Sequence, residues 1–272
     1  MEIQFDGSGD PRGGRINNYL LEKSRVVFQT KNERNFHIFY QLLAGLSPDL
    51  IEEFGLRKHP TPDEFYYLNQ SGCYRVDRID DLSDFNDTVN AMNTMRISIG
   101  EQKEIFRLLL GILYLGNIKF QPAGKDEVTV ANKDVMQTFA KILLVQPQLA
   151  EKCICFRTIQ SSTGSRGTVY SVPLDVEQAC LSRDALAKAI YSRLFDYIIS
   201  RINQNLVCTV QSSIIIGVLD IYGFEIFEVF IFFPFSSLPF PFPFPFPSPS
   251  LLPSPSTSLS LPLPPSPSLS LK

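Results

Sequence analysis

A sharp change in composition near residue 228 limits which part of this chain can form a folded domain. From Val229 to Lys272 the sequence has no Asp or Glu and one Lys, and it holds 13 of the 20 prolines and 8 of the 22 phenylalanines. In its Phe-Pro repeats every second backbone N–H is missing, so a helix, a central strand and a transmembrane helix are all excluded. We therefore predict a folded region over 1–228 and a disordered low-complexity tail over 229–272.

Four residue types, Pro, Ser, Leu and Phe, make up 40 of the 44 residues of this tail. Apart from one serine codon family, their codons begin with two pyrimidines, so a pyrimidine-rich non-coding tract would give such a sequence if it were translated. The codon for Val229 begins with GT, as an unspliced intron does. The other interpretation is a genuine Pro-rich linker or a ligand in the polyproline II conformation.

The folded region is close to electrically balanced. The whole chain has 25 Lys and Arg against 28 Asp and Glu, a net charge of −3, and only Lys272 of those cations lies in the tail. A broad binder of nucleic acid or anionic membranes would carry a basic excess, which argues against both partners. Five cysteines without regular spacing favour reduced thiols over a secreted disulfide scaffold. The N-terminal residues lack the features of a signal peptide, and we expect a cytoplasmic protein.

Hydrophobic spacing predicts a mostly helical region with a few strands. Ser98 and Glu101 have the spacing of a helix-capping box. The unbroken apolar run 213–219 predicts a fully buried strand. Helices are predicted over 32–45, from Ser83, from Ser98 to about Gly116, over 134–144 and over 182–206. A strand–turn–strand unit is predicted over 1–29, with Gly7–Pro11 and Gly13-Gly14 as turn residues, and a hairpin over 156–160 and 168–172, with 161–167 as its loop.

The sequence Asp220-Ile-Tyr-Gly223 follows the predicted buried strand directly. Nucleotide hydrolases use an Asp at such a place near Mg²⁺, and a glycine whose N–H reaches the γ-phosphate because no Cβ blocks it. The spacing is also typical of an ordinary strand that ends in Asp and a glycine turn, so both interpretations stay open. The chain contains no phosphate-binding G-x-x-x-x-G-K-[ST] loop. His37 and His59 lie near no cysteine cluster, which argues against a zinc site.

Six sequence blocks together resemble the motor domain of myosin, most closely that of class I myosins. They occur in the family's order and at matching spacing over about residues 1–228, whereas any single block would carry little weight. The blocks are Tyr19–Val26, Glu33–Leu43, Tyr67–Gly72, Leu113–Phe120, Arg183–Phe195 and Asp220–Phe227.

The resemblance implies an α/β, P-loop NTPase-like motor of which this chain is an incomplete piece. That piece is the mostly helical upper subdomain, from just after switch I to the end of switch II, with a hairpin at 2–22 and the strand at 213–219 as parts of the central transducer sheet. The family's switch II would give Asp220 a water-mediated role at Mg²⁺, Gly223 an N–H bond to the γ-phosphate of ATP, and Glu225 a salt bridge to a switch I arginine.

The resemblance also assigns the hairpin at 156–172 to an actin-contacting loop, with Arg157, Arg166 and Thr168 as contacting residues. Thr168 lies sixteen residues before Asp184, the family position where an acidic or phosphorylatable residue tunes the actin-activated ATPase. With Arg166 two residues before it, Thr168 resembles a site for a Ste20/PAK-type kinase, and a phosphate would add about −1.5 to −2 charges. In the alternative, Thr168 is only a β-branched residue of the hairpin.

The resemblance places the family's P-loop and switch I upstream of Met1, and its relay helix, lower actin-binding subdomain, converter and neck after Phe227. Glu225 therefore lacks its arginine partner within this sequence. One hypothesis is a piece of an actin-based ATPase motor of the actin cytoskeleton that is nearly inert alone. The other is a non-enzymatic truncated product that binds actin weakly through the hairpin, or an inert or dominant-negative fragment. In both we expect weak ATP binding and an unpaired edge on strand 213–219, which favours aggregation.

Overall fold

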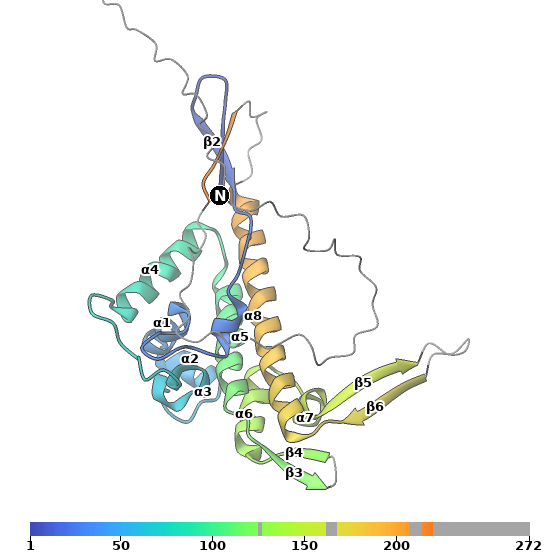
Figure 1. The fold of residues 1–272 in the computed structure, drawn as a ribbon. Helices are drawn as coiled ribbons and strands as arrows, with labels where there is room; N and C mark the ends of the chain where they lie inside the picture. Colours follow the sequence, from blue (N-terminus) through green and yellow to red (C-terminus); the bar gives the residue numbers. More distant parts are fainter. Residues whose placement is uncertain (125–126, 162–167, 207–213, 220–272) are drawn as a thin grey trace, which may run out of the picture. The chain divides into compact units, whose positions relative to one another are not determined.

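A computed structural model describes residues 1–124, 127–161, 168–206 and 214–219. The chain divides into two units, Met1–Tyr222 and Gly223–Lys272, and every described residue lies in the first, so the predicted tail lies outside the described residues. The elements, shown in Figure 1, are β1 (Glu2–Phe5), β2 (Pro11–Arg15), the 3₁₀ helix η1 (Lys23–Val26), α1 (His37–Gly45), α2 (Pro48–Glu53), η2 (Pro62–Glu64), α3 (Tyr66–Asn69), α4 (Asp81–Thr94), α5 (Ile99–Gly116), β3 (Phe120–Gly124), β4 (Glu127–Val130), α6 (Lys133–Ile142), α7 (Pro147–Cys155), β5 (Phe156–Ser161), β6 (Thr168–Pro173), α8 (Val176–Leu206) and β7 (Ile214–Gly217).

Helix α5 forms the centre of a helical body. The predicted capping box fixes its first turn: the Glu101 N–H donates to Ser98 Oγ over 3.3 Å, and the Ser98 N–H donates to Glu101 Oε2 over 3.0 Å. Apolar side chains surround the helix, and Leu110, Ile112 and Leu113 have no exposed surface. Helices α1, α3, α4, α6 and α8 pack around it, as expected for a helix whose second half, after Arg107, is almost entirely apolar.

Helix α8 is 31 residues long, which corresponds to about 46 Å. It begins earlier than predicted because the Asp175 carboxylate caps it, accepting the N–H of Gln178 over 2.8 Å. Its buried residues recur along one stripe that ends with Tyr191 and Leu194. The last third of α8 therefore has no fully buried residue, although Ile198 still packs against the core.

Strands β2, β1 and β7 form an antiparallel sheet in that order. Ile3 of β1 lies opposite Gly14 on one side and Ile216 on the other. The prediction that Gly13 and Gly14 form a turn is wrong, because both lie within β2. A Cβ on Gly14 would come within 3.0 Å of the Glu2 carbonyl oxygen, so the close pairing of β1 and β2 explains the glycine.

The second strand of this hairpin ends at Arg15, whereas the prediction extended the hairpin to residue 22. The cause is the next residue, Ile16, whose backbone N–H and carbonyl both bond to the side chain of Asn203 on α8. The chain leaves the sheet at this point and continues to η1, where Val26 is fully buried. Leu21 and Val26 of this segment therefore pack into the helical body, whereas Tyr19 and Leu20 are exposed.

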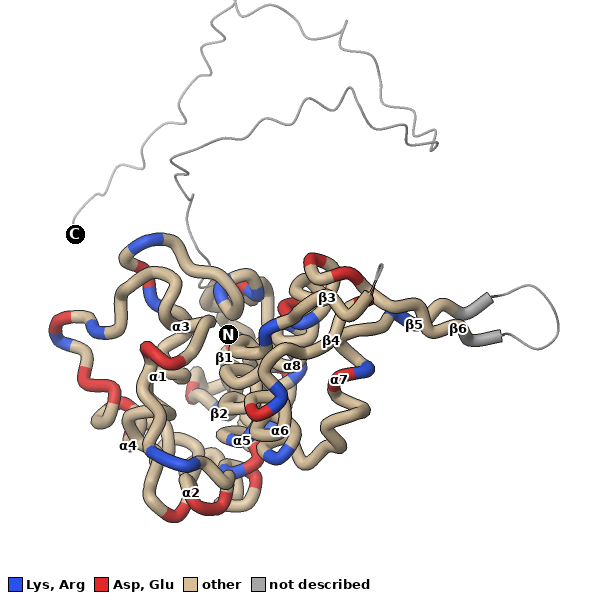
Figure 2. The backbone as a smooth tube through the Cα atoms, turned by 90° about the horizontal axis from the view of Figure 1, so that it is seen from below, with Lys and Arg blue, Asp and Glu red and all other residues tan. Residues whose placement is uncertain are grey.

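Two further hairpins flank the body. The hairpin β5–β6 is confirmed, with Phe156 opposite Pro173 at its base, and β3–β4 was not predicted. Figure 1 shows both near the N-terminal end of α8, whereas the three-stranded sheet lies by its C-terminal end. Figure 2 shows acidic and basic residues interspersed along the described backbone, and neither sign gathers on one side.

The predicted helices are present with shifted ends. Helix α1 begins later than predicted, because the buried Asn35 amide donates to the carbonyls of Val26 and Tyr67 and holds the preceding segment extended. Helix α4 begins before Ser83, with Asp80 as its cap. Helix α6 ends short of residue 144, which has a left-handed φ of 56°. The short helices α2 and α3, and α7, were not predicted.

Candidate functional site

The strand before the predicted switch II segment is β7, at the edge of the three-stranded sheet. Its pairing with β1 runs to Gly217, and the N–H of Val218 then donates to the carbonyl of Met1 over 2.7 Å. The ladder thus continues to within two residues of the predicted nucleotide site. The residues of that site lie outside the described residues: Asp220, Gly223 and Glu225.

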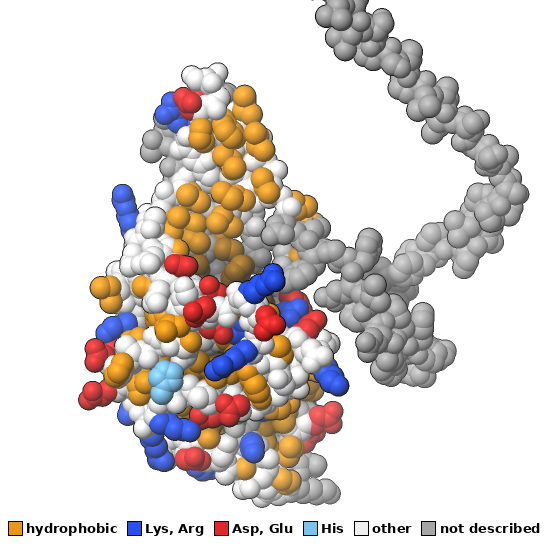
Figure 3. Space-filling view, turned by 90° about the vertical axis from the view of Figure 1, so that its left-hand side faces the viewer, with side chains coloured by type: hydrophobic (Ala, Val, Ile, Leu, Met, Phe, Trp, Pro, Cys, Tyr) orange, Lys and Arg blue, Asp and Glu red, His pale blue; other side chains and the backbone are white. Residues whose placement is uncertain are grey.

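The prediction that this strand is fully buried is wrong in this structure. Ile214, Ile215 and Ile216 are each exposed over at least half of their surface. The reason is that β7 has one neighbouring strand and that no other described layer covers it. Figure 3 shows apolar side chains gathered at the end of the molecule that carries the sheet. An apolar edge strand of this kind is suited to pairing with a further strand.

The predicted actin-contacting hairpin is an antiparallel ladder in which Arg157 lies opposite Val172 and Ser161 lies opposite Thr168. Arg157 is exposed near the base. Four ladder positions separate it from Thr168, about 13 Å at the usual rise per residue. The structure therefore does not place Arg157 next to Thr168, and Arg166 lies outside the described residues.

The base of this hairpin is fixed to the helical body. Ile154 and Cys155, the last residues of α7, are buried, and the Leu174 N–H donates to the carbonyl of Cys155 over 2.9 Å. Burial raises the pKa of the Cys155 thiol to about 11, so this thiol stays protonated at neutral pH. The hairpin thus projects from a rigid base that continues directly into α8.

A buried polar cluster, not predicted from the sequence, joins α8 to α3 and α5. Arg183 donates to Asp184 Oδ1 over 2.8 Å and to the Ile118 carbonyl over 3.0 Å, and the Tyr67 hydroxyl donates to the same Asp184 oxygen over 2.6 Å. Burial raises the pKa of Tyr67 far above its usual value, so the hydroxyl remains a donor. The four-residue step from Ala179 to Arg183, which places the arginine on the buried stripe, is the signal that could have revealed it.

The part of the chain that the structure describes offers no set of ligands for a nucleotide–metal complex. No group of three or more His, Cys, Asp or Glu side chains among those residues is placed to hold a metal ion. None of the described helices is long and apolar enough to cross a membrane. The residues predicted at Mg²⁺ and ATP all follow β7 in the sequence and lie outside the described residues.

Comparison with known proteins identifies the class to which this fold belongs. Residues 1–236 match the myosin head (motor domain) family. Since this match covers most of the chain, the protein belongs to the myosin head family. The resemblance seen in the six sequence blocks is thereby confirmed.

Two relatives indicate the class within this family. The chain is 52% identical over 234 residues to the myosin ID heavy chain of Dictyostelium discoideum and 51% identical over 229 residues to the myosin IC heavy chain of Acanthamoeba castellanii. Both alignments cover 84% of this chain, but they cover 21% and 18% of the relatives. The chain is thus similar to class I myosin motor domains and spans about a fifth of the length of these relatives.

Proposed function

We propose that this chain is part of an actin-based, ATP-dependent class I myosin motor with a P-loop NTPase-like fold. The observation that carries the proposal is the family match over residues 1–236, which includes the strand β7 and the Asp220–Glu225 segment after it. Hydrolysis of ATP, binding of Mg²⁺ and movement on actin would be activities of a longer protein, because this chain spans about a fifth of its relatives. Such a motor would work at the actin cytoskeleton in the cytoplasm.

In this proposal the chain contributes switch II. Asp220 would hold a water molecule of Mg²⁺, Gly223 would donate its backbone N–H to the γ-phosphate, and Glu225 would pair with an arginine outside this sequence. Catalysis of phosphoryl transfer depends mostly on positioned charges and hydrogen-bond donors. The described β1–β7 ladder supports the proposal, because it ends just before these residues and would set where they begin.

The test is a complete class I motor in which residues 1–228 replace the corresponding segment. We expect actin-activated ATPase in this chimera and its loss in Gly223→Ala, because a Cβ would stand between the N–H and the phosphate. Gly100→Ala is the matched control, since a Cβ on Gly100 in α5 would meet nothing within 4 Å. An inactive chimera, or full activity of Gly223→Ala, would refute the proposal.

We further propose that the hairpin β5–β6 contacts actin and that a Ste20/PAK-type kinase phosphorylates Thr168. Arg166, two residues earlier, would support kinase recognition, and the register does not favour Arg157 as a direct phosphate partner. In the chimera, Thr168→Glu should keep high actin-activated ATPase and Thr168→Ala should lower it. Equal rates for the two variants, together with no labelling of the wild-type hairpin by the kinase, would contradict this role.

The alternative is a non-enzymatic truncated product, catalytically inert or weakly actin-binding. It is favoured by the composition of residues 229–272, of which 40 of 44 are Pro, Ser, Leu or Phe. Sequencing of the transcript separates the two. A message that continues from Glu228 into a relay-helix sequence supports the motor, and a spliced message that encodes the Pro/Phe tail supports the truncated product.

A further inference from the structure

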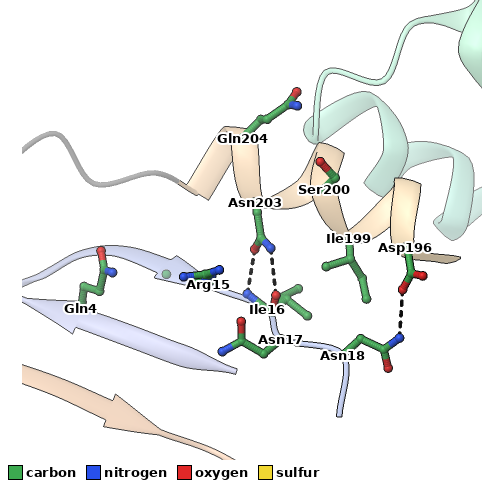
Figure 4. A pocket seen from close by; sticks show the side chains of 11 residues that line it. Gln4, Arg15, Ile16, Asn17, Asn18, Asp196, Ile199, Ser200, Asn203 and Gln204 are labelled. Carbon is green, nitrogen blue, oxygen red and sulfur yellow. Dashed lines mark hydrogen bonds between the residues drawn. The ribbon is translucent and has the colours of Figure 1, made fainter. Parts of the chain in front are cut away.

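The last third of α8 touches the three-stranded sheet through a side-chain amide. Asn203 Oδ1 accepts the N–H of Ile16 over 2.7 Å, and Asn203 Nδ2 donates to the carbonyl of Ile16 over 2.8 Å (Figure 4). The planar amide thus satisfies both backbone groups of the first residue after β2, as a neighbouring strand would. Asn and Gln carry a carbonyl acceptor and an N–H donor side by side in one planar amide, which is the arrangement that this pair of bonds uses.

A second hydrogen bond, this one between two side chains, lies on the same face of α8. Asn18 Nδ2 donates to Asp196 Oδ1 over 3.0 Å. Asp196 and Asn203 are seven residues apart, which is close to two helical turns, so both face the connector that follows β2. We refer to the bonds of Asn203 and Asp196 with this connector, residues 16–18, as the clamp.

The clamp is polar and lies in an open pocket. The pocket has a volume of about 680 Å³, and residues from β1, β2, the connector and α8 line it, with Ile199 among its apolar side chains. Around the opposite side of this part of α8, Arg201 pairs with Glu101 over 2.9 Å and Asn205 donates to the Met95 carbonyl over 2.7 Å. The helix end is therefore fixed to the body on one side and to the sheet on the other.

We propose that Asn203 is a positioning residue that fixes the sheet carrying β7 to α8. Since β2, β1 and β7 are hydrogen-bonded in one sheet, a bond that holds the end of β2 also holds the strand that leads to Asp220. The N-terminal end of α8 follows β6 directly. A displacement of the hairpin β5–β6 would therefore be transmitted along α8 and through the clamp to the sheet. The assignment of switch II rests on the proposed function, whereas the clamp itself rests on the described contacts.

Hydrogen exchange on the 272-residue chain tests the clamp without any assumption about motor activity. Asn203→Ala should speed exchange at the Ile16 amide between about fivefold and thirtyfold, the effect of losing one or two hydrogen bonds. Exchange in β1 and β2 should rise with it, while α5 should stay unchanged. Asn205→Ala is the matched control, because its amide binds the body and not the sheet, and it should leave Ile16 unchanged.

Unchanged exchange at Ile16 in Asn203→Ala, or an equal rise in the sheet and in α5, would overturn the proposal. If Asn203→Ala does not fold, Asn18→Ala removes only the second bond and should give a smaller rise confined to the connector and sheet. No rise at the connector in Asn18→Ala would then overturn the proposal.

Kinetics of the chimeric motor separate positioning from a role in binding actin. Asn203→Ala should lower the maximal actin-activated rate several-fold and leave the actin concentration at half-maximal rate unchanged, because Asn203 does not lie on the hairpin. A change confined to the half-maximal concentration would contradict the proposal. An inactive wild-type chimera would refute the proposed function and leave the exchange result standing.

Discussion

The helical body and the three-stranded sheet contain similar apolar residues, but only the body buries them. Leu113 of α5 is fully buried, whereas Ile215 of β7 is 58% exposed. Described helices surround α5, whereas β7 has one neighbour in the sheet. This difference indicates that, among the described residues, the body contributes most of the free energy of unfolding. The sheet is held instead by its own backbone hydrogen bonds and by the clamp.

The largest expected effect compares these two residues directly. Leu113→Ala should lower the free energy of unfolding by about 2–5 kcal/mol, because it leaves a cavity in the core. Ile215→Ala should change it by less than about 0.5 kcal/mol, because little surface is buried there. Urea unfolding followed by circular dichroism measures both. Equal losses would show that the sheet contributes to the core as much as α5 does.

A smaller effect is expected from the buried polar cluster in the body. Tyr67→Phe should cost about 1–2 kcal/mol, because the half-buried Asp184 loses a hydrogen bond of 2.6 Å from a fully buried tyrosine. The neighbouring Tyr66 is 46% exposed, and Tyr66→Phe should stay within about 0.5 kcal/mol of the wild type. The same unfolding measurement applies, and the prediction does not survive if the two variants are indistinguishable.

The contact between α5 and the last third of α8 should respond to acid. The Ser98 N–H, with the Tyr197 hydroxyl and Arg201, lowers the pKa of Glu101 to about 2 from an ordinary 4.5. Because this pKa is lower in the folded state, the stabilisation is complete above pH 4.5 and is lost as the pH falls toward 2.

Glu101→Gln should therefore flatten the dependence of unfolding free energy on pH between about pH 4.5 and 2. Tyr197→Phe, which removes one of the causes of the lowered pKa, should flatten it less. Thermal or urea unfolding in a pH series gives both slopes. A Glu101→Gln slope equal to that of the wild type would contradict the assignment of this carboxylate.

The smallest effect on stability is expected at the sheet edge, where the change should appear in association. Ile215→Lys should leave the unfolding free energy nearly unchanged and reduce aggregation of the chain, because a charge on an edge strand opposes edge-to-edge pairing. Sedimentation velocity at increasing concentration checks this. A monomeric wild-type chain that melts cooperatively at moderate concentration would remove the reason for the prediction.

The elements with local signals were predictable from the sequence. The capping pair Ser98 and Glu101 fixes the start of α5 through bonds within one turn, and two short segments on either side of the polar loop 161–167 predict the hairpin β5–β6. Helix α7 and the hairpin β3–β4 were not predicted. Their apolar residues are explained only by the contacts that they make with α6 and α8 in the fold. Local spacing cannot reveal such partners.

The functional residues divide in the same way. The motif Asp220–Glu225 was identified because it is short and contiguous, and its placement stays a prediction. Asn203 gave no signal, because a polar residue near a helix end usually faces solvent and its partner Ile16 lies 187 residues away. The burial of β7 was predicted wrongly, because an apolar run gives no information on whether a layer covers it.

The central proposal is that this chain contributes switch II to a nucleotide site whose phosphate-binding loop belongs to another segment of a longer motor. Titration of a fluorescent ATP analogue against the 272-residue chain and against the chimeric motor tests it most directly. We predict tight binding to the motor and none to the chain, because switch II supplies at most one N–H and one water-mediated carboxylate to the nucleotide. Micromolar affinity of the chain by itself would contradict the account.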